Sequence, residues 1–129
     1  MIGVIKLHHV SFAITDLEAS KHFFGQVLAL PEIPRPAFRF SGAWYALGDR
    51  QLHLIQVEAG KSEATGRIGR SDHMALEVGD IEAVKKRLGD SGVAFTEGGN
   101  RDLGIEQIFC CDPDGHMVEF VRYLAPPGT

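Results

Sequence analysis

The sequence predicts an α+β fold made of two tandem βαβββ modules, and three observations support this prediction. The 129 residues are the size of one domain. The chain resembles itself at an offset of 64 residues, which places His9 on His73 and Asp16 on Asp80. Each copy shows alternating apolar residues first, then an amphipathic helical pattern, and then short strand patterns. A repeat of this length indicates a duplicated module rather than a long solenoid.

Composition excludes several classes of protein. Hydrophobic residues make up 44% and charged residues 23% of the chain, as in ordinary globular proteins. The formal net charge of −4 argues against a nucleic-acid or membrane surface, and no apolar run reaches the roughly 20 residues that span a bilayer. Cys110 and Cys111 are adjacent, so a strand would point them to opposite faces, and neither a disulfide framework nor a secretory signal is evident. We therefore expect a cytoplasmic protein with no nucleic-acid or membrane partner.

The first module, residues 6–58, is predicted to begin with an alternating strand over 6–14. The segment Thr15–Glu18 has the form of a capping box, in which Thr15 bonds forward to a free amide of the helix start and Glu18 bonds back. The helix ends before Pro31. Three short strands complete the module, over residues 37–40, 43–48 and 51–57.

The second module, residues 71–123, repeats this order. It is predicted to have a first strand over 72–78 and a helix that ends near Gly92. Three strands then follow, over residues 93–96, 105–111 and 116–123. A polar linker, residues 59–70, joins the two modules into one domain that covers residues 1–129.

The period of two in the strands places four polar side chains on equivalent faces. His9 in the first strand lies opposite the large apolar residues that face the helix, and His73 repeats this position in the second module. His53 and Glu119 lie on the same kind of face in the last strands. Three imidazoles and one carboxylate suit a divalent ion of the first transition row, such as zinc, nickel, cobalt, manganese or iron(II). No phosphate-binding glycine loop is present, and we expect no organic cofactor.

Other residues are candidates for a substrate pocket. Arg35 and Arg101 are suited to hold a carboxylate or phosphate, because guanidinium pairs with either in a bidentate manner. Phe38 and Trp44 offer flat apolar surfaces on which a planar ligand can stack. Gln107 is a further candidate, although the parity of its strand is not fixed by the pattern.

Several segments resemble the vicinal-oxygen-chelate superfamily, which includes glyoxalase I, extradiol dioxygenases and bleomycin-binding proteins. The resemblance extends over residues 6–123 and is carried by segments 7–10, 15–20, 23–24, 27–30 and 112–120. It implies paired βαβββ modules whose sheets curl around a metal cavity. It also implies that His9, His53, His73 and Glu119 are the metal ligands and that the protein is a homodimer. The cavity then forms either between the modules of one chain or between two chains.

The resemblance implies three functions. The first is a glyoxalase I-like lyase or isomerase. In it the ion binds vicinal oxygens of a small-molecule substrate and stabilises an enediolate, while Glu119 acts as base. Here His53 departs from the glyoxalase I pattern, which has Glu at that position. The second is an extradiol dioxygenase, in which His9, His73 and Glu119 bind iron(II) and His53 is an acid or base. The third is a non-catalytic binding protein of the bleomycin-resistance type.

Overall fold

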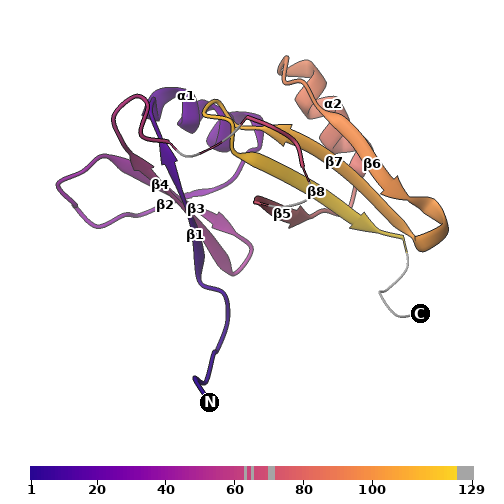
Figure 1. Ribbon diagram of the computed structural model, residues 1–129, viewed down its shortest axis with the longest axis horizontal. Helices are drawn as coiled ribbons and strands as arrows, with labels where there is room; N and C mark the ends of the chain where they lie inside the picture. The colour runs from indigo at the N-terminus through magenta and orange to yellow at the C-terminus, as the bar shows by residue number, and fades with distance from the viewer. Residues whose placement is uncertain (63, 65, 70–71, 125–129) are drawn as a thin grey trace. The chain divides into compact units, whose positions relative to one another are not determined.

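The computed structural model describes residues 1–62, 64, 66–69 and 72–124. The chain divides into two compact units, Met1–Glu63 and Ala64–Thr129, which we call module 1 and module 2. Each contains one four-stranded sheet (Figure 1). Residues 63, 65 and 70 of the predicted linker, and residue 71, lie outside the described residues.

Module 1 has a mixed sheet with the strand order β1-β4-β3-β2. Strand β1 runs parallel to β4, whereas β3 is antiparallel to both β4 and β2. Its elements are β1 (His9–Ile14), α1 (Leu17–Lys21), η1 (His22–Val27), β2 (Glu32–Ile33), β3 (Gly42–Leu47) and β4 (Arg50–Gln56).

Module 2 repeats the topology with the order β5-β8-β7-β6. Here β5 runs parallel to β8, and the other two pairs are antiparallel. Its elements are β5 (His73–Glu77), α2 (Ile81–Asp90), β6 (Thr96–Asn100), η2 (Arg101–Leu103), β7 (Ile105–Cys111) and β8 (Met117–Tyr123). The α+β fold with two βαβββ repeats is therefore confirmed, and β7 has the predicted bounds.

The helix of each module covers one face of its own sheet. Helix α1 contacts β3 and β4, and helix α2 contacts β7 and β8. Residues between helix and sheet are fully buried; they include Phe24, Leu52 and Leu54 in module 1 and Leu88, Ile108 and Val118 in module 2. Burial of one sheet face under the helix leaves the opposite face to carry polar side chains. Within the described residues, no helix has the length and apolarity needed to cross a membrane.

The capping box predicted at Thr15 is wrong by one residue. Asp16 is the N-cap, and its carboxylate accepts a hydrogen bond from the Ala19 amide at 3.1 Å. Asp80 caps α2 in the same way, with the Ala83 amide at 3.1 Å. The extended backbone of each aspartate (φ −136° and −146°) brings its short carboxylate to the third amide of the helix.

Two predicted strands lie elsewhere in the structure. Residues 37–40 form no strand, and β2 is the short segment Glu32–Ile33 instead, because Pro34 and Pro36 have no amide for a sheet ladder. Residues 93–96 are replaced by β6, which begins at Thr96. The Val93 amide donates to the Leu88 carbonyl at 2.9 Å and so closes helix α2.

Candidate functional site

The sheet registers place the four predicted ligands at equivalent positions in the two modules. In module 1, Ser11 of β1 pairs with His53 of β4, and His9 lies on β1 two residues before Ser11. In module 2, Ala75 pairs with Glu119, and His73 precedes it by two residues. Each module therefore has a half-site of two candidate ligands on the parallel strand pair β1/β4 or β5/β8.

The half-site of module 1 is a stack of three rings from three adjacent strands. The imidazole of His53 lies between the rings of His9 and Trp44, with centroid separations of 4.0 and 3.9 Å and interplanar angles of 15° and 3°. His53 is 8% exposed. Burial lowers the pKa of His53, and the positive charges of His9, His8 and Arg35 lower it further. The imidazole is therefore held neutral, the form in which a histidine binds a metal.

Two further polar side chains orient these imidazoles. Gln51 Oε1 lies 2.8 Å from His53 Nε2, so this nitrogen donates and Nδ1 is left with a lone pair. His8 Nδ1 lies 2.9 Å from His9 Nδ1, which leaves Nε2 as the available nitrogen of His9. Partners of this kind fix the orientation of metal-binding histidines in proteins.

The half-site of module 2 combines an imidazole with a buried carboxylate. His73 Nε2 lies 3.0 Å from Glu119 Oε1, and Gln107 Nε2 donates to Glu119 Oε2 at 3.1 Å. Glu119 is 7% exposed. In the part of the chain that the structure describes, no lysine or arginine pairs with this carboxylate. A buried carboxylate without a cationic partner is costly.

This donor set fits a divalent ion. An ion bound at Glu119 would offset the charge of the buried carboxylate. The 3.0 Å between His73 Nε2 and Glu119 Oε1 is also the spacing of two ligands that lie about 2.1 Å from one ion and about 90° apart. The half-site of module 1 holds the other two candidate ligands, His9 and His53. Among the described residues, no group of three or more His, Cys, Asp or Glu side chains is close enough to hold a metal ion.

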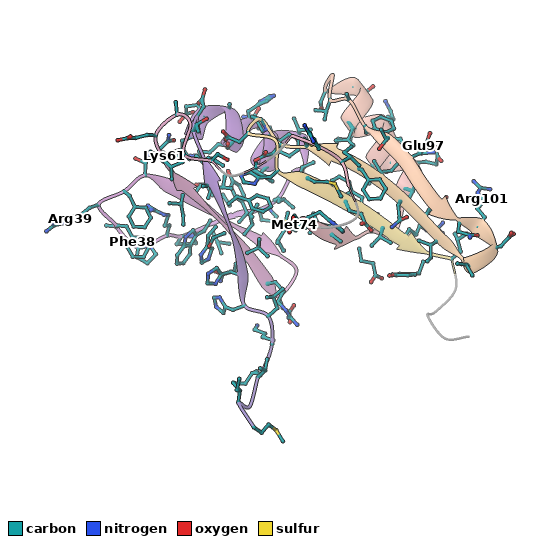
Figure 2. The ribbon with its side chains drawn as sticks, viewed as in Figure 1. Phe38, Arg39, Lys61, Met74, Glu97 and Arg101 are labelled. Carbon is teal, nitrogen blue, oxygen red and sulfur yellow. The ribbon has the colours of Figure 1, made fainter. Side chains whose placement is uncertain are left out.

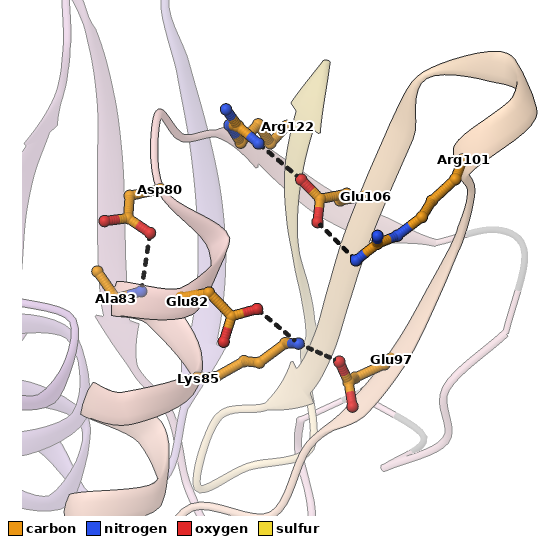
Figure 3. Close-up of polar contacts among 8 residues, drawn as sticks. All are labelled: Asp80, Glu82, Ala83, Lys85, Glu97, Arg101, Glu106 and Arg122. Atoms are coloured by element: carbon orange, nitrogen blue, oxygen red, sulfur yellow. Dashed lines mark hydrogen bonds and ion pairs between the residues drawn. The ribbon is translucent and has the colours of Figure 1, made fainter. Parts of the chain in front are cut away.

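The predicted pocket residues have different positions. Trp44, Phe38 and Arg35 lie in or beside the ring stack of module 1, and Gln107 contacts Glu119. The structure does not bring Arg101 to this face. Its side chain is 85% exposed, and Nη2 lies 4.0 Å from Glu106 Oε2 (Figure 3).

The position of Arg101 follows from strand parity. Glu106 alternates with Gln107 along β7, so its side chain lies on the face covered by α2. Glu106 also accepts from Arg122 at 2.8 Å, and it is this ion pair that Arg101 joins. Arg101 therefore forms a surface contact on the opposite side of the sheet from Glu119.

Sequence reasoning missed the roles of His8 and Gln51. Gln51 had a usable signal, because it precedes His53 by two residues and so shares its face of β4. His8 had none, because strict alternation assigns it to the face opposite His9. The chain at His8 lies before the first residue of β1, where the alternation does not apply.

Known proteins resemble this chain over most of its length. The model of the family described as Glyoxalase/Bleomycin resistance protein/Dioxygenase superfamily matches residues 6–120. A lactoylglutathione lyase of Neisseria meningitidis is 29% identical over 126 residues, which cover 92% of this chain and 91% of that protein. The glutathione transferase FosA of Serratia marcescens is 30% identical over 115 residues, which cover 88% of this chain and 77% of that protein.

Solved structures share the fold. A glyoxalase/dioxygenase from Nostoc punctiforme has a TM-score of 0.78 at 22% identity, covering 94% of this chain and 92% of the other. A mutant of the fosfomycin resistance protein FosX from Listeria monocytogenes, solved with Mn(II) and a dihydroxypropylphosphonic acid, has a TM-score of 0.75 at 16% identity. That alignment covers 95% of this chain and 94% of the other.

Proposed function

The chain belongs to the Glyoxalase/Bleomycin resistance protein/Dioxygenase superfamily, and we propose that it is a metal-dependent lyase or isomerase of the glyoxalase I type. The proposal assigns His9 and His53 of module 1 and His73 and Glu119 of module 2 as ligands of a divalent ion. The modules of one chain or of two chains supply them. The substrate class is the thiol conjugates of 2-oxoaldehydes.

One observation carries this proposal. Glu119 is a carboxylate that is 7% exposed and has an imidazole and an amide as its polar partners. A cation beside such a group offsets its charge, and an isolated buried charge is destabilising. The repeat places imidazoles at all three other equivalent positions, and imidazole with carboxylate is a ligand set for first-row metals.

When bound, a divalent ion supplies Lewis-acid stabilisation of negative charge on neighbouring substrate oxygens. The chain itself must move a proton. Glu119 is the carboxylate of the four, so it would be released from the ion to act as base. Its freed oxygen takes the proton from the substrate carbon beside a carbonyl and returns it to the neighbouring carbon. Gln107 holds Oε2 by its hydrogen bond. Oε1 is therefore the oxygen that takes the substrate proton, and it contacts His73 when it carries none.

A second candidate is an extradiol dioxygenase, and the environment of His53 favours it. The ring of His53 is stacked on both faces and its Nε2 is bonded to Gln51, so it can serve as an acid or base instead of a ligand. His9, His73 and Glu119 then form the two-histidine, one-carboxylate set of iron(II) oxygenases.

The proposal includes a homodimer in the cytoplasm. The two cysteines are both free, which supports a reducing compartment because disulfides form where conditions are oxidising. Sedimentation of the purified protein tests the dimer directly.

Elemental analysis of protein purified without chelators tests the proposed function. We expect a near-stoichiometric divalent ion in the wild type that is lost in His73→Ala and kept in His22→Ala, since His22 lies on η1 and pairs with Gln26. Nickel, cobalt, manganese or zinc, with turnover of the hemithioacetal of methylglyoxal and glutathione, supports the lyase. Iron with oxygen uptake on catechol supports the dioxygenase instead. Protein that takes up no ion even after soaking would contradict both and favour a binding protein.

A further inference from the structure

Flat side chains continue outward from the half-site of module 1. Beyond His53 and Trp44, the ring of Phe38 lies 6.2 Å from that of Trp44, and the ring of Phe40 lies 5.1 Å from that of Phe38 at an interplanar angle of 9°. We call His9, His53, Trp44, Phe38 and Phe40 the aromatic row. Its inner end is the candidate ligand pair. At its outer end, Phe38 and Phe40 are 46% and 47% exposed.

Arg35 is fixed at the outer end of the aromatic row. Its guanidinium carbon lies 5.1 Å from the ring centre of Phe38 and 4.9 Å from that of Phe40. Nη2 donates to the Phe40 carbonyl at 2.7 Å, and Nε is buried with no hydrogen-bond partner among the described residues. Gly42 makes room for this packing, since a Cβ there would lie 3.2 Å from both nitrogens. The loop therefore holds one cation beside two exposed rings.

The charge along the aromatic row is of one sign. Arg35, His8 and His9 are the charged groups that act on His53, and all of them are positive when ionised. No hydrogen bond or ion pair joins a described carboxylate of module 1 to the row. Glu32 pairs with Lys21, Asp49 pairs with Arg50, and Asp16 caps α1. A cationic ligand would be repelled here, and an anion would be attracted.

We propose that Arg35, Phe38 and Phe40 bind an aromatic carboxylate, whose ring stacks on the two phenylalanines while its carboxylate pairs with the guanidinium. Stacking on flat rings favours a planar ligand, and guanidinium favours a carboxylate over a neutral group. This inference goes beyond the proposed function, because it names a second class of ligand that is distinct from the thiol conjugates and binds at the outer end of the aromatic row. The binding itself requires module 1 alone and no metal.

The single tryptophan of the chain, Trp44, lies in the aromatic row and reports on binding there. We would titrate metal-free protein with benzoate and follow Trp44 fluorescence and the heat of binding. Cyclohexanecarboxylate keeps the charge without the flat ring, and benzyl alcohol keeps the ring without the charge. We expect benzoate to bind at least about tenfold more tightly than either. Equal affinity for benzoate and cyclohexanecarboxylate would overturn the proposal.

Variants locate the site. We expect Arg35→Gln and Phe40→Leu each to weaken benzoate about tenfold, with circular dichroism unchanged. Arg39→Gln is the matched control, because Figure 2 shows Arg39 on the same loop, pointing away from Phe38. It should leave the affinity unchanged, and an equal loss in this control would show that the loop acts only through its net charge. Trp44 fluorescence that depends on protein concentration and ignores benzoate would assign the row to a second copy of the chain instead.

The same titration separates this inference from the proposed function. Benzoate binding by a protein that never takes up metal would support the aromatic site and contradict the proposed enzyme. Metal uptake without benzoate binding would support the proposed enzyme and contradict the aromatic site.

Discussion

His53 and Glu119 occupy the same position in the two modules, each paired with the third residue of the first strand: His53 with Ser11 and Glu119 with Ala75. Their surroundings differ. His53 is stacked between two rings, whereas Glu119 is bound at both oxygens by His73 and Gln107. The duplication therefore preserved the placement of the side chain and changed its chemistry, because the same position presents an imidazole in module 1 and a carboxylate in module 2.

The hydrogen bond from Gln107 to Glu119 predicts an effect on metal affinity. Gln107→Leu keeps a similar volume but removes the donor at Oε2, which leaves a buried carboxylate oxygen unpaired. We expect the dissociation constant of the bound ion to rise about 10- to 100-fold, as when other orienting partners of metal ligands are removed. Competition with a chromophoric chelator measures this constant.

Arg101→Gln is the control for the Gln107 variant. Arg101 pairs with Glu106 on the helix-covered side of the sheet and has no contact with Glu119 among the described residues. Its replacement should leave the metal affinity unchanged. If both variants weakened the metal to the same degree, the loss would come from module 2 as a whole and not from the bond to Glu119.

His8 is predicted to act on the metal through His9. Its Nδ1 lies 2.9 Å from His9 Nδ1, which fixes the ring of His9 with Nε2 available. His8→Phe should therefore raise the metal dissociation constant about tenfold, whereas His9→Ala should remove a ligand and abolish tight binding. His22→Phe, on η1, should have neither effect. An unchanged dissociation constant in His8→Phe would show that His9 needs no orienting partner.

The topology and the equivalent positions of the four candidate ligands could be predicted because they depend on periods and repeats. The period of two assigns faces along β1 and β4 without reference to any distant contact. The repeat then adds a second example of each position. Module 2 was predicted well where its turn chemistry was clear, as at the strand β7 that ends before Asp112-Pro113.

The details that were wrong or missed depend on contacts distant in sequence or on local geometry. The loop containing Phe38 has enough apolar residues for a strand, but its prolines and the packing of Arg35 on Gly42 prevent one. Arg101 carries the right charge for a substrate site, yet its ion-pair partner, Glu106, lies on the face of the sheet opposite Glu119. The periodicity of the sequence does not indicate whether a long side chain such as that of Arg101 pairs with a substrate or with a carboxylate of the chain.

The close approach of strands β3 and β4 leaves no room for a side chain at Gly42. A Cβ at Gly42 would lie 2.2 Å from the Leu54 carbonyl oxygen, a clash with backbone that side-chain movement cannot relieve. We expect Gly42→Ala to lower the free energy of unfolding by about 2–3 kcal/mol. Gly89→Ala is the matched control, because Gly89 lies within α2 with open space around it. Alanine there should raise stability by about 0.5–1 kcal/mol, and urea unfolding measures both. Equal effects of the two substitutions would contradict the predicted clash.

Stability should fall at alkaline pH because two buried groups resist deprotonation. Burial raises the pKa of Cys110 from 9.0 to about 12, and burial with the nearby charge of Glu32 raises the pKa of Tyr45 from 10.0 to about 12. Well below pH 9 both groups are protonated in the folded and the unfolded chain, so they contribute no pH dependence there. Above their ordinary pKa values and up to about 12, the unfolded chain releases protons that the folded chain keeps. The free energy of unfolding therefore decreases as pH rises through this range, by at most about 1.4 kcal/mol per pH unit for each group.

Urea unfolding at about pH 8 and about pH 10.5 measures this slope. The double variant Cys110→Ala/Tyr45→Phe should have a shallower slope than the wild type, because it has lost both groups that hold their protons. Tyr45→Phe alone should cost little stability at neutral pH, since its buried hydroxyl has no hydrogen-bond partner among the described residues. Cys111→Ala is the control for the thiol, because Cys111 is only half-buried and should change the slope less than Cys110→Ala. A double variant as pH-sensitive as the wild type would show that these two groups are not the ones that titrate on unfolding.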